Sequence, residues 1–471
     1  MTLIGVILVL AFVFIREFLG RNPAIVANKI VLHGPRNLMN NYNEGVNEGS
    51  TDNKGSSHRG GSAETGGDEN VWGVENFENG ENGDNGGNGD NEVAKLIRDK
   101  VPTPETSTVC YKKILVLDDL IAETRFQYPF NHVSRVPDTE ENIFQGSLQC
   151  PSSHGWNCTF ELTFSANYTR HMHGKDAVVL NIAPLSTLKN VDALYANIDQ
   201  PHLMVFFSLE SPERVYEVMK LKNLLDLPVH EMWSYHASSF PYRPYGVYNP
   251  NVPRPRYWEK VRGSANKTGL VLWMGSNCYR TYWPRLGFVL ELQKHVSVDI
   301  YGECGDKRCP IKGPGAKEKC YKVRATYKFY LALENSECEY YITEKLWLNA
   351  LKNGVVPIVY GARRKDYERL LPPNSFIYAG DYDSIQSLAD YLQELDKRPD
   401  LYQKYLEWYG SVYPYRGINM QTFCGILPLF GKLEKGNLEK KPLKTLPWFN
   451  TCRIPAANAT LQHELLDWQP W

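Results

Sequence analysis

Three consecutive polar residues, Thr343, Glu344 and Lys345, have side chains suited to binding a charged ligand. Thr343 is a favourable residue to cap the start of a helix, and Glu344 suits the positive end of a helix dipole. A helix start also presents free backbone N–H groups that favour an anion, and Lys345 adds a full positive charge. A nucleoside diphosphate with its ribose fits this combination, although a bare Thr-Glu-Lys is more often a solvated first helical turn.

The segments on either side predict a unit that would hold these residues at the edge of a sheet. Residues 329–333 and 355–360 are short apolar runs, as expected for strands buried on both faces. Between them we expect a loop at 335–341, a helix with apolar residues at 346–351, and a left-handed helix cap at Gly354. Such a right-handed βαβ unit places the loop and the helix start at the carboxyl ends of the strands, where open α/β folds bind ligands.

Glu210 is a second candidate for chemistry, because it directly follows the apolar run 203–208. Pro212 stands where a helix would start, so Glu210 is expected in a loop at the carboxyl end of a strand. By this criterion alone, a glutamate in a loop is usually just solvated. Further apolar runs at 113–117 and 176–182 alternate with helical stretches and predict a parallel α/β domain.

A second α/β domain is predicted after the proline-rich polar stretch 247–265, which we interpret as an interdomain linker. Its first strand is expected at 270–274 and is followed by a Gly-Ser-Asn turn. A helix is expected at 284–294 and another strand at 298–302. The unit that carries Thr343 to Lys345 then continues this domain.

The stretch 329–361, FYLALENSECEYYITEKLWLNALKNGVVPIVYG, resembles the donor-binding signature of the α1,3/4-fucosyltransferases, glycosyltransferase family 10. The usual form of that signature is close to FYLAFENS…DYITEKLW.NAL…VPVV.G, and the match runs almost unbroken through the stretch. The Glu-Ser-Pro at 210–212 and the Ser-Asn turn at 276–277 also agree with the family. The similarity covers roughly residues 110–425.

The resemblance implies roles for individual residues. Glu210 would be the general base. Arg285 would bind the donor pyrophosphate with its planar fork, and Arg280 is an alternative because the spacing after Ser-Asn varies. Lys345 would stabilise the leaving diphosphate. The contacts to fucose, ribose and guanine would come from Tyr245, Tyr330, Asn335, Tyr341 and Glu344.

One loop departs from the family pattern. The family usually has Y-R-x-D-S-D…P-Y-G where this chain has WSYHASSFPYRPYG at 233–246. Tyr235 and Tyr245 agree, whereas His236, Ser238 and Phe240 replace an arginine and two aspartates. Tyr245 is therefore still expected at the donor, while the charge network of the loop has been rewritten.

Cysteines and sequons predict the secretory pathway. Ten cysteines suit disulfides, and their spacing lacks the CxxC pairs or histidine partners of a zinc site; Cys424 and Cys452 are candidates to tie down the C-terminal tail. The candidate N-glycosylation sites are Asn157, Asn167, Asn266 and Asn458. The net charge of −1 gives no reason to expect nucleic acid. Without a DxD motif we predict no essential metal or cofactor, with Mn²⁺ at most stimulatory.

Residues 1–20 are predicted to be a signal anchor and residues 21–108 a disordered stem. The apolar run 3–15 is shorter than the roughly 20 residues of a spanning helix, so a cleaved signal peptide is the alternative. Arg16 and Arg21 follow the run, opposite to the positive-inside rule for a lumenal head. The stretch 36–100 is too rich in Gly, Asn, Asp, Glu and Ser to offset the entropy of ordering.

These features predict an α/β protein with two Rossmann-like domains in a GT-B-like arrangement: an acceptor-side domain at 109–250, a GDP-fucose-binding domain at 265–425, and a C-terminal tail at 426–471. The resemblance implies an inverting α1,3-fucosyltransferase that moves L-fucose from GDP-fucose to N-acetylglucosamine of a glycoprotein or glycolipid glycan. It also implies a single-pass type II protein of the Golgi membrane with its head in the lumen. A protein O-fucosyltransferase and a catalytically silent glycan-binding protein are the alternatives, and the acceptor glycan stays open.

Overall fold

The computed structural model describes residues 108–117, 134–135, 143–150, 156–165, 171–188, 191–198, 202–251, 267–309, 316–408, 412–414, 421–465 and 469–470. The expected anchor, nearly all of the expected stem, most of the expected linker, Asn167 and Asn266 lie outside these residues. Within the described residues, no helix has the length and apolar character that crossing a membrane requires.

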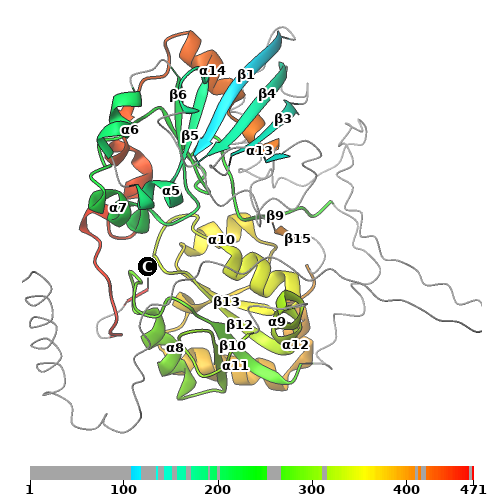
Figure 1. Ribbon diagram of the computed structural model, residues 1–471. Helices are drawn as coiled ribbons and strands as arrows, with labels where there is room; N and C mark the ends of the chain where they lie inside the picture. Colours follow the sequence, from blue (N-terminus) through cyan, green and yellow to red (C-terminus); the bar gives the residue numbers. More distant parts are fainter. Residues whose placement is uncertain are drawn as a thin grey trace, which may run out of the picture. The chain divides into compact units, whose positions relative to one another are not determined.

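The first part of the described chain forms a mixed sheet in the order β2-β3-β4-β1-β5-β6-β8 (Figure 1). Its parallel strands are β4 (Trp156–Ser165), β1 (Thr108–Leu117), β5 (Ala177–Asn181), β6 (Leu203–Phe207) and β8 (Glu231–Trp233). The strands β2 (Ser134–Arg135) and β3 (Phe144–Cys150) extend one edge in antiparallel pairing. The predicted strands at 113–117, 176–182 and 203–208 are confirmed, although β1 begins earlier, at Thr108.

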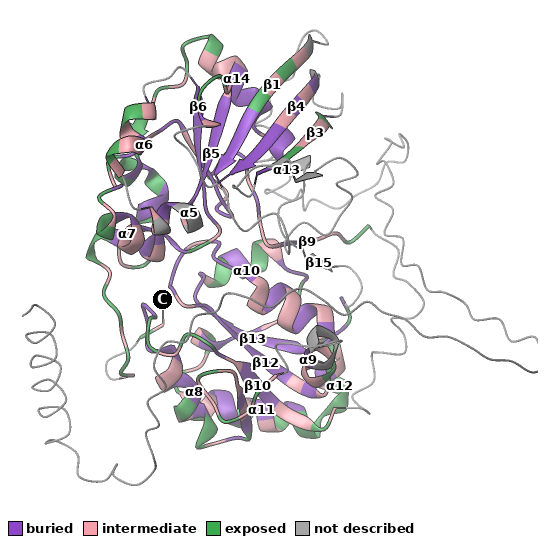
Figure 2. Ribbon diagram, viewed as in Figure 1, coloured by how far each residue is buried: buried purple, intermediate pink, exposed green. Residues whose placement is uncertain are grey.

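Both faces of this sheet are covered, and successive residues of β1 alternate between them. Leu115 and Leu117 face the core that includes side chains of α6 (Val191–Ile198) and α7 (Pro212–Leu221), and α5 (Ile182–Thr187) lies on the same side (Figure 1). Ile114 and Val116 face the core beneath α13 (Gln421–Cys424) and α14 (Leu427–Glu434). The strands β5 and β6 and residues 114–117 of β1 are therefore fully buried, as Figure 2 shows for β5 and β6, and this explains their continuous apolar runs.

The C-terminal tail predicted at 426–471 contributes elements that pack on the first sheet. We call this sheet, together with the helices and turns that cover it, the first body. Besides α14, the strand β16 (Lys441–Pro442) pairs with β7 (Pro228–Val229). Three short 3-10 turns follow, η7 (Leu443–Thr445), η8 (Pro447–Asn450) and η9 (Ala456–Asn458), and Trp448 and Phe449 join the core on the α7 side. A further short ladder joins β9 (Gly246–Tyr248) to β15 (Val412–Pro414).

The second sheet is fully parallel, in the order β11-β10-β12-β13-β14. Its strands are β10 (Gly269–Met274), β11 (Val298–Tyr301), β12 (Tyr327–Leu333), β13 (Val356–Tyr360) and β14 (Ile377–Tyr378). Its helices are α8 (Arg285–Gln293), α9 (Ala316–Ala325), α10 (Arg364–Leu370), α11 (Ile385–Lys397) and α12 (Pro399–Lys404), with a 3-10 turn η6 (Ala379–Asp381). The chain continues from β10 to β11 on one side and then crosses to β12 on the other side of β10. The carboxyl ends of β10 and β12 therefore form a topological switch point.

The helix predicted after Lys345 is present but is wider than an α-helix. Residues Lys345–Ala350 form a π-helical segment, η4, followed by a 3-10 turn, η5 (Leu351–Asn353). Glu344 directly precedes this segment with helical φ and ψ of −53° and −21° and makes no side-chain cap, whereas the hydroxyl of Thr343, the predicted cap, accepts the Lys345 main-chain N–H at 3.4 Å. Gly354 ends the turn with φ of 62°, which confirms the predicted left-handed cap. Short π segments of this kind occur frequently at functional sites.

All ten cysteines are paired, which confirms the predicted disulfides. The bonds are Cys110–Cys158, Cys150–Cys424, Cys278–Cys304, Cys309–Cys320 and Cys338–Cys452. Cys424 and Cys452 both tie the C-terminal segment to the rest, the first to β3 and the second to the loop after β12.

Candidate functional site

A cavity of about 630 Å³ lies at the carboxyl ends of β10 and β12. Met274 to Asn277 line it directly after β10, and Asn335 lines it after β12, so it occupies the switch point of the parallel sheet. The first body contributes Glu210, Arg214 and Tyr245. Seven of the predicted site residues line this one cavity: Glu210, Tyr245, Arg285, Asn335, Tyr341, Glu344 and Lys345.

Lys345 lies at the centre of a buried polar cluster on the second-sheet side. Its ammonium is 2.9 Å from Oε2 of Glu334 and 2.8 Å from the hydroxyl of Thr343. Glu334 is 1% exposed and also accepts hydrogen bonds from the Thr343 main-chain N–H at 2.7 Å and hydroxyl at 2.8 Å. The Thr343 hydroxyl thus donates to Glu334 while it accepts from the Lys345 ammonium and, at 3.4 Å, from the Lys345 main-chain N–H.

Opposing effects set the charges in this cluster. Burial alone would lower the pKa of Lys345, but the carboxylates of Glu334 and Glu344 outweigh burial and hold that pKa above its ordinary value. Burial raises the pKa of Glu334, and the neighbouring Lys345 opposes the rise. Lys345 is therefore a permanent cation at the cavity wall, which suits a diphosphate.

Sequence reasoning missed Glu334, although the residue carried a signal. It is an ionisable residue placed directly after a strand that is buried on both faces. Such a residue must find a partner, because an unpaired buried charge is costly.

Arg285 begins α8, and its guanidinium lies between the end of β12 and the turn after β10. Its Nη1 donates to the Leu333 carbonyl at 3.0 Å and its Nη2 to the Asn277 carbonyl at 2.7 Å, while the group stacks over Trp273 at 5.6 Å. It is 4% exposed, and burial lowers its pKa. Arg285 lines the cavity as predicted, but it also ties the turn after β10 to the end of β12.

The cavity wall carries more positive than negative charge. Arg280, the predicted alternative to Arg285, also lines it and pairs with Glu217 at 2.7 Å. The lining includes six cationic side chains (Arg214, Arg280, Arg285, Arg308, Arg324 and Lys345) against three carboxylates (Glu210, Glu303 and Glu344). This excess favours a multiply charged anion.

Glu210 is exposed on the cavity wall that the first body forms, and hydrogen bonds of the main chain fix the position of its loop. Its N–H donates to the Ser208 hydroxyl at 3.0 Å, and the hydroxyl of Tyr245 donates to the neighbouring Leu209 carbonyl. The next residue, Ser211, caps α7, and Pro212 begins that helix, which confirms the predicted helix start. Burial raises the pKa of Tyr341, and the charge of Glu210 raises it further. The carboxylate and that phenol therefore influence each other electrostatically.

Tyr330 is the one predicted donor contact that the structure removes from the cavity wall. It is 1% exposed within β12, and its hydroxyl accepts a hydrogen bond from the amide of Asn349 at 3.1 Å. Asn349 lines the cavity in its place. Tyr330 faces the core because strand residues alternate and this strand is covered on both faces.

The helix that follows Glu210 contacts the loop after β12 directly. The hydroxyl of Ser336 donates to that of Ser211 at 2.7 Å. Glu213 is buried beside Ser336 and Cys338; burial raises the pKa of its carboxyl to about 8, the bond with Ser336 opposes this, and the charge of Glu337 adds to it. This carboxyl therefore retains its proton at neutral pH.

Among the sequon asparagines, Asn458 lies in η9 and is exposed, as a glycosylation site requires. Asn157 lies in β4.

The chain is similar to known fucosyltransferases. Residues 264–437 match the family model described as "Glycosyltransferase family 10 (fucosyltransferase) C-term". The chain is 42% identical over 172 residues to "Glycoprotein 3-alpha-L-fucosyltransferase A" of Drosophila melanogaster, covering 36% of this chain and 33% of that relative. It is 39% identical over 220 residues to "4-galactosyl-N-acetylglucosaminide 3-alpha-L-fucosyltransferase FUT5" of Homo sapiens, covering 47% and 55%. These alignments span between a third and just over half of the relatives.

A longer alignment links the chain to the corresponding FUT5 protein of Gorilla gorilla gorilla, with 36% identity over 287 residues, 61% of this chain and 69% of that relative. A solved structure, "Crystal Structure of alpha1,3-Fucosyltransferase with GDP-fucose", is similar with a TM-score of 0.39 and 15% identity, covering 73% of this chain and 97% of that one. Because more than two thirds of the gorilla relative is matched at this identity, the chain belongs to glycosyltransferase family 10, the fucosyltransferases.

Proposed function

We propose that this protein transfers L-fucose from GDP-fucose to a hydroxyl of N-acetylglucosamine in a glycan, forming an α1,3 linkage with inversion at the anomeric carbon. One observation carries the proposal: an exposed carboxylate, Glu210, shares a cavity with the Lys345 cation and an excess of positive charge. Family membership and the α1,3 specificity in the names of the relatives support the reaction class.

The proposed reaction is a single displacement. Glu210 accepts the proton of the acceptor hydroxyl as that oxygen bonds to C1 of fucose. The bond between C1 and the phosphate oxygen breaks at the same time, and GDP leaves with the bonding electron pair. Lys345 and the arginines of the wall stabilise the negative charge that develops on the diphosphate.

The remaining wall residues have side chains that suit a sugar nucleotide. Glu344 and Asn349 can hydrogen-bond sugar hydroxyls, and Tyr245 and Tyr341 offer aromatic faces. We propose a GT-B-like arrangement in which the fully parallel sheet binds the donor and the mixed sheet supplies the base and contacts the acceptor. The volume of about 630 Å³ lies within the usual range for ligand pockets of this kind.

We also propose that the protein acts in the Golgi lumen as a single-pass type II membrane protein. Five disulfides and the exposed sequon at Asn458 support an oxidising secretory compartment. A residue such as Lys345 supplies the positive charge that a metal supplies in other transferases, so we propose that no metal is essential.

The test is a transfer assay with the full chain, GDP-fucose and a panel of core N-glycans, LacNAc, LacdiNAc and a folded glycoprotein. We expect transfer to one acceptor class in chelator as well as without it. Glu210→Gln should keep GDP-fucose binding and lose about 100-fold or more in turnover. Glu407→Gln, which changes an exposed carboxylate outside the cavity, is the control and should be nearly neutral.

Three outcomes would contradict parts of this proposal. Near-normal turnover of Glu210→Gln would exclude Glu210 as the base. Activity that is lost in chelator and restored by Mn²⁺ would exclude the metal-free reaction. Binding of GDP-fucose without transfer to any acceptor would favour a glycan-binding role over catalysis.

A further inference from the structure

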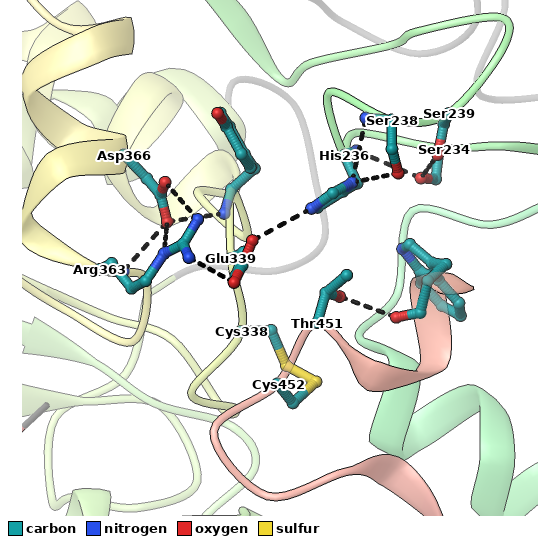
Figure 3. A network of polar contacts seen from close by, with 12 residues as sticks. Ser234, His236, Ser238, Ser239, Cys338, Glu339, Arg363, Asp366, Thr451 and Cys452 are labelled. Carbon is teal, nitrogen blue, oxygen red and sulfur yellow. Dashed lines mark hydrogen bonds and ion pairs between the residues drawn. A yellow bond between two sulfur atoms is a disulfide. The ribbon is translucent and has the colours of Figure 1, made fainter. Parts of the chain in front are cut away.

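The loop that departs from the family pattern is joined to the second sheet by a line of polar contacts (Figure 3). The line runs from His236 to Glu339, then to Arg363 at the start of α10, and ends at Asp366. Glu339 belongs to the loop after β12, whose other residues Asn335 and Tyr341 line the cavity. The rewritten loop therefore contacts a segment that forms part of the site.

The hydrogen bonds around His236 fix its ring and its proton. The main-chain N–H of Ser238 donates to Nδ1 at 3.1 Å, so Nδ1 is an acceptor and the neutral ring carries its proton on Nε2. Nε2 lies 3.6 Å from Oε2 of Glu339. Burial lowers the pKa of His236 and the Glu339 carboxylate opposes this, and the net lowering favours the neutral ring. The Nε2–H of the ring therefore lies near the Glu339 carboxylate at a distance longer than a hydrogen bond, so the contact is electrostatic.

Arg363 carries the cation of this network. It binds Asp366 with two parallel contacts, Nε to Oδ2 and Nη2 to Oδ1, both at 3.1 Å, and its Nη1 contacts Glu339. Asp366 is fully buried, and its Oδ2 also accepts the main-chain N–H of Tyr340 at 3.2 Å. A bidentate pair of this kind fixes both partners in orientation.

Tyr340 receives all of these restraints and has an unusual backbone. Its φ of 57° lies in the left-handed region, which a bulky residue adopts only when its surroundings enforce it. Asp366 holds its N–H, Arg369 donates to its hydroxyl at 2.6 Å, and the His236 ring lies edge-on to its ring at 5.1 Å. The next residue is Tyr341, which lines the cavity and packs against Tyr235 at 5.0 Å.

We propose that His236 and Asp366 are positioning residues that hold Tyr340 in its left-handed conformation and thereby set Tyr341 in the cavity. The inference rests on the proposed function in one respect, since it takes the ligand of Tyr341 to be the sugar nucleotide. It explains how the chain accommodates His236 at a position where the family usually has arginine: the cation of the network is supplied from α10 by Arg363.

The test is a double-mutant cycle on binding of GDP-fucose, measured by calorimetry with the full chain. We expect His236→Leu, Asp366→Asn and Tyr341→Ala each to weaken binding about 10-fold. If His236 acts through Tyr341, His236→Leu should have almost no further effect in the Tyr341→Ala background, whereas independent sites would give additive losses. His236→Gln keeps a polar N–H group near the Glu339 carboxylate and should stay within about 3-fold of the wild type.

Asp381→Asn is the matched control for Asp366→Asn. Asp381 also pairs with an arginine of α10, because Nε of Arg364 donates a bifurcated hydrogen bond to its two carboxylate oxygens at 2.8 and 3.0 Å, but this pair is exposed and makes no contact with Tyr340. This control should bind GDP-fucose as the wild type does. If Asp366→Asn fails to fold, the pair of His236→Leu and His236→Gln carries the test alone.

A second measurement is independent of any ligand. Hydrogen exchange of the 338–342 amides should become about 10-fold faster in His236→Leu and remain unchanged in Asp381→Asn. Unchanged exchange, or additive losses in the cycle, would overturn the positioning role. Faster exchange in a protein that does not bind GDP-fucose would support the positioning role while refuting the proposed function.

Discussion

The two walls of the cavity hold their carboxylates in opposite ways. On the first-body wall, Glu210 is exposed and is positioned by main-chain contacts around Ser208 and Leu209. On the second-sheet wall, Glu334 is buried and fully engaged by Lys345 and Thr343. A group that must accept a proton benefits from access to substrate, whereas a group that fixes a cation benefits from burial. Removing a partner on the buried wall should therefore affect stability as well as binding, and removing Glu210 should affect turnover alone.

The largest effect is expected from Lys345→Met, which leaves Glu334 buried without its cation. We expect a loss of about 3–5 kcal/mol in the free energy of unfolding, as for other broken buried ion pairs. The affinity for GDP should also fall about 10–100-fold, because charge-assisted hydrogen bonds to the diphosphate are lost. Chemical denaturation and calorimetry measure the two quantities.

Lys365→Met is the control for this variant, because Lys365 is an exposed lysine of α10. It should leave both stability and affinity unchanged. If Lys345→Met is as stable as Lys365→Met, the buried ion pair of Glu334 and Lys345 does not contribute to stability, and the proposed difference between the two walls is wrong.

An intermediate effect is expected from Glu213→Gln. This variant tests whether the effect of a carboxylate on stability depends on its burial or on the cavity wall to which it belongs. Glu213 lies in the first turn of α7, three residues after Glu210, yet it is buried. Its carboxyl has a pKa of about 8 compared with an ordinary 4.5. Between these values the unfolded chain releases the proton while the folded chain retains it. The stability that this group contributes is therefore complete below about pH 4.5 and is lost as the pH rises to about 8.

The measurement for Glu213 is the free energy of unfolding of both proteins between pH 5 and pH 8.5. The wild type should lose about 4 kcal/mol more than Glu213→Gln across this range. Parallel curves would show that the Glu213 carboxyl ionises normally.

The smallest effect is expected from Tyr330→Phe. This change removes one hydrogen bond to Asn349 and leaves the packing of β12 intact, so the cost should be about 1 kcal/mol in stability. Because Tyr330 lies behind the wall, KM for GDP-fucose should change by no more than about 3-fold. A loss as large as that of Tyr341→Ala would place Tyr330 among the direct donor contacts after all.

Local patterns were sufficient to predict the elements that carry the site. The apolar runs around 203–208, 270–274 and 329–333 became buried strands, because strands covered on both faces require continuous apolar sequence. The positions of Glu210 and Lys345 followed from the ends of those strands. Seven of the predicted residues meet in one cavity for this reason.

Contacts between distant segments could not be predicted in the same way. The tie from Tyr340 to Asp366 and Arg369 depends on how α10 packs, and the tie from Cys338 to Cys452 depends on the path of the C-terminal segment. The apolar spacing of Lys345–Ala350 is equally compatible with an α-helix, so it did not predict the π-helical form. Tyr330 was misplaced because its type suited the ligand, while its position in the strand turned it inward.

The return of the C-terminal segment to the first sheet has a consequence for synthesis on the ribosome. Phe160, Phe164 and Trp233 belong to early strands, yet they pack against Phe423 and Phe430 from α13 and α14. That face of the sheet stays exposed until nearly the whole chain has left the ribosome, and Cys150 has to wait equally long for Cys424. A nonsense mutation shortly before residue 421 would therefore leave both sheets encoded, but the first sheet would lack the helices that cover this face and would expose an aggregation-prone apolar surface.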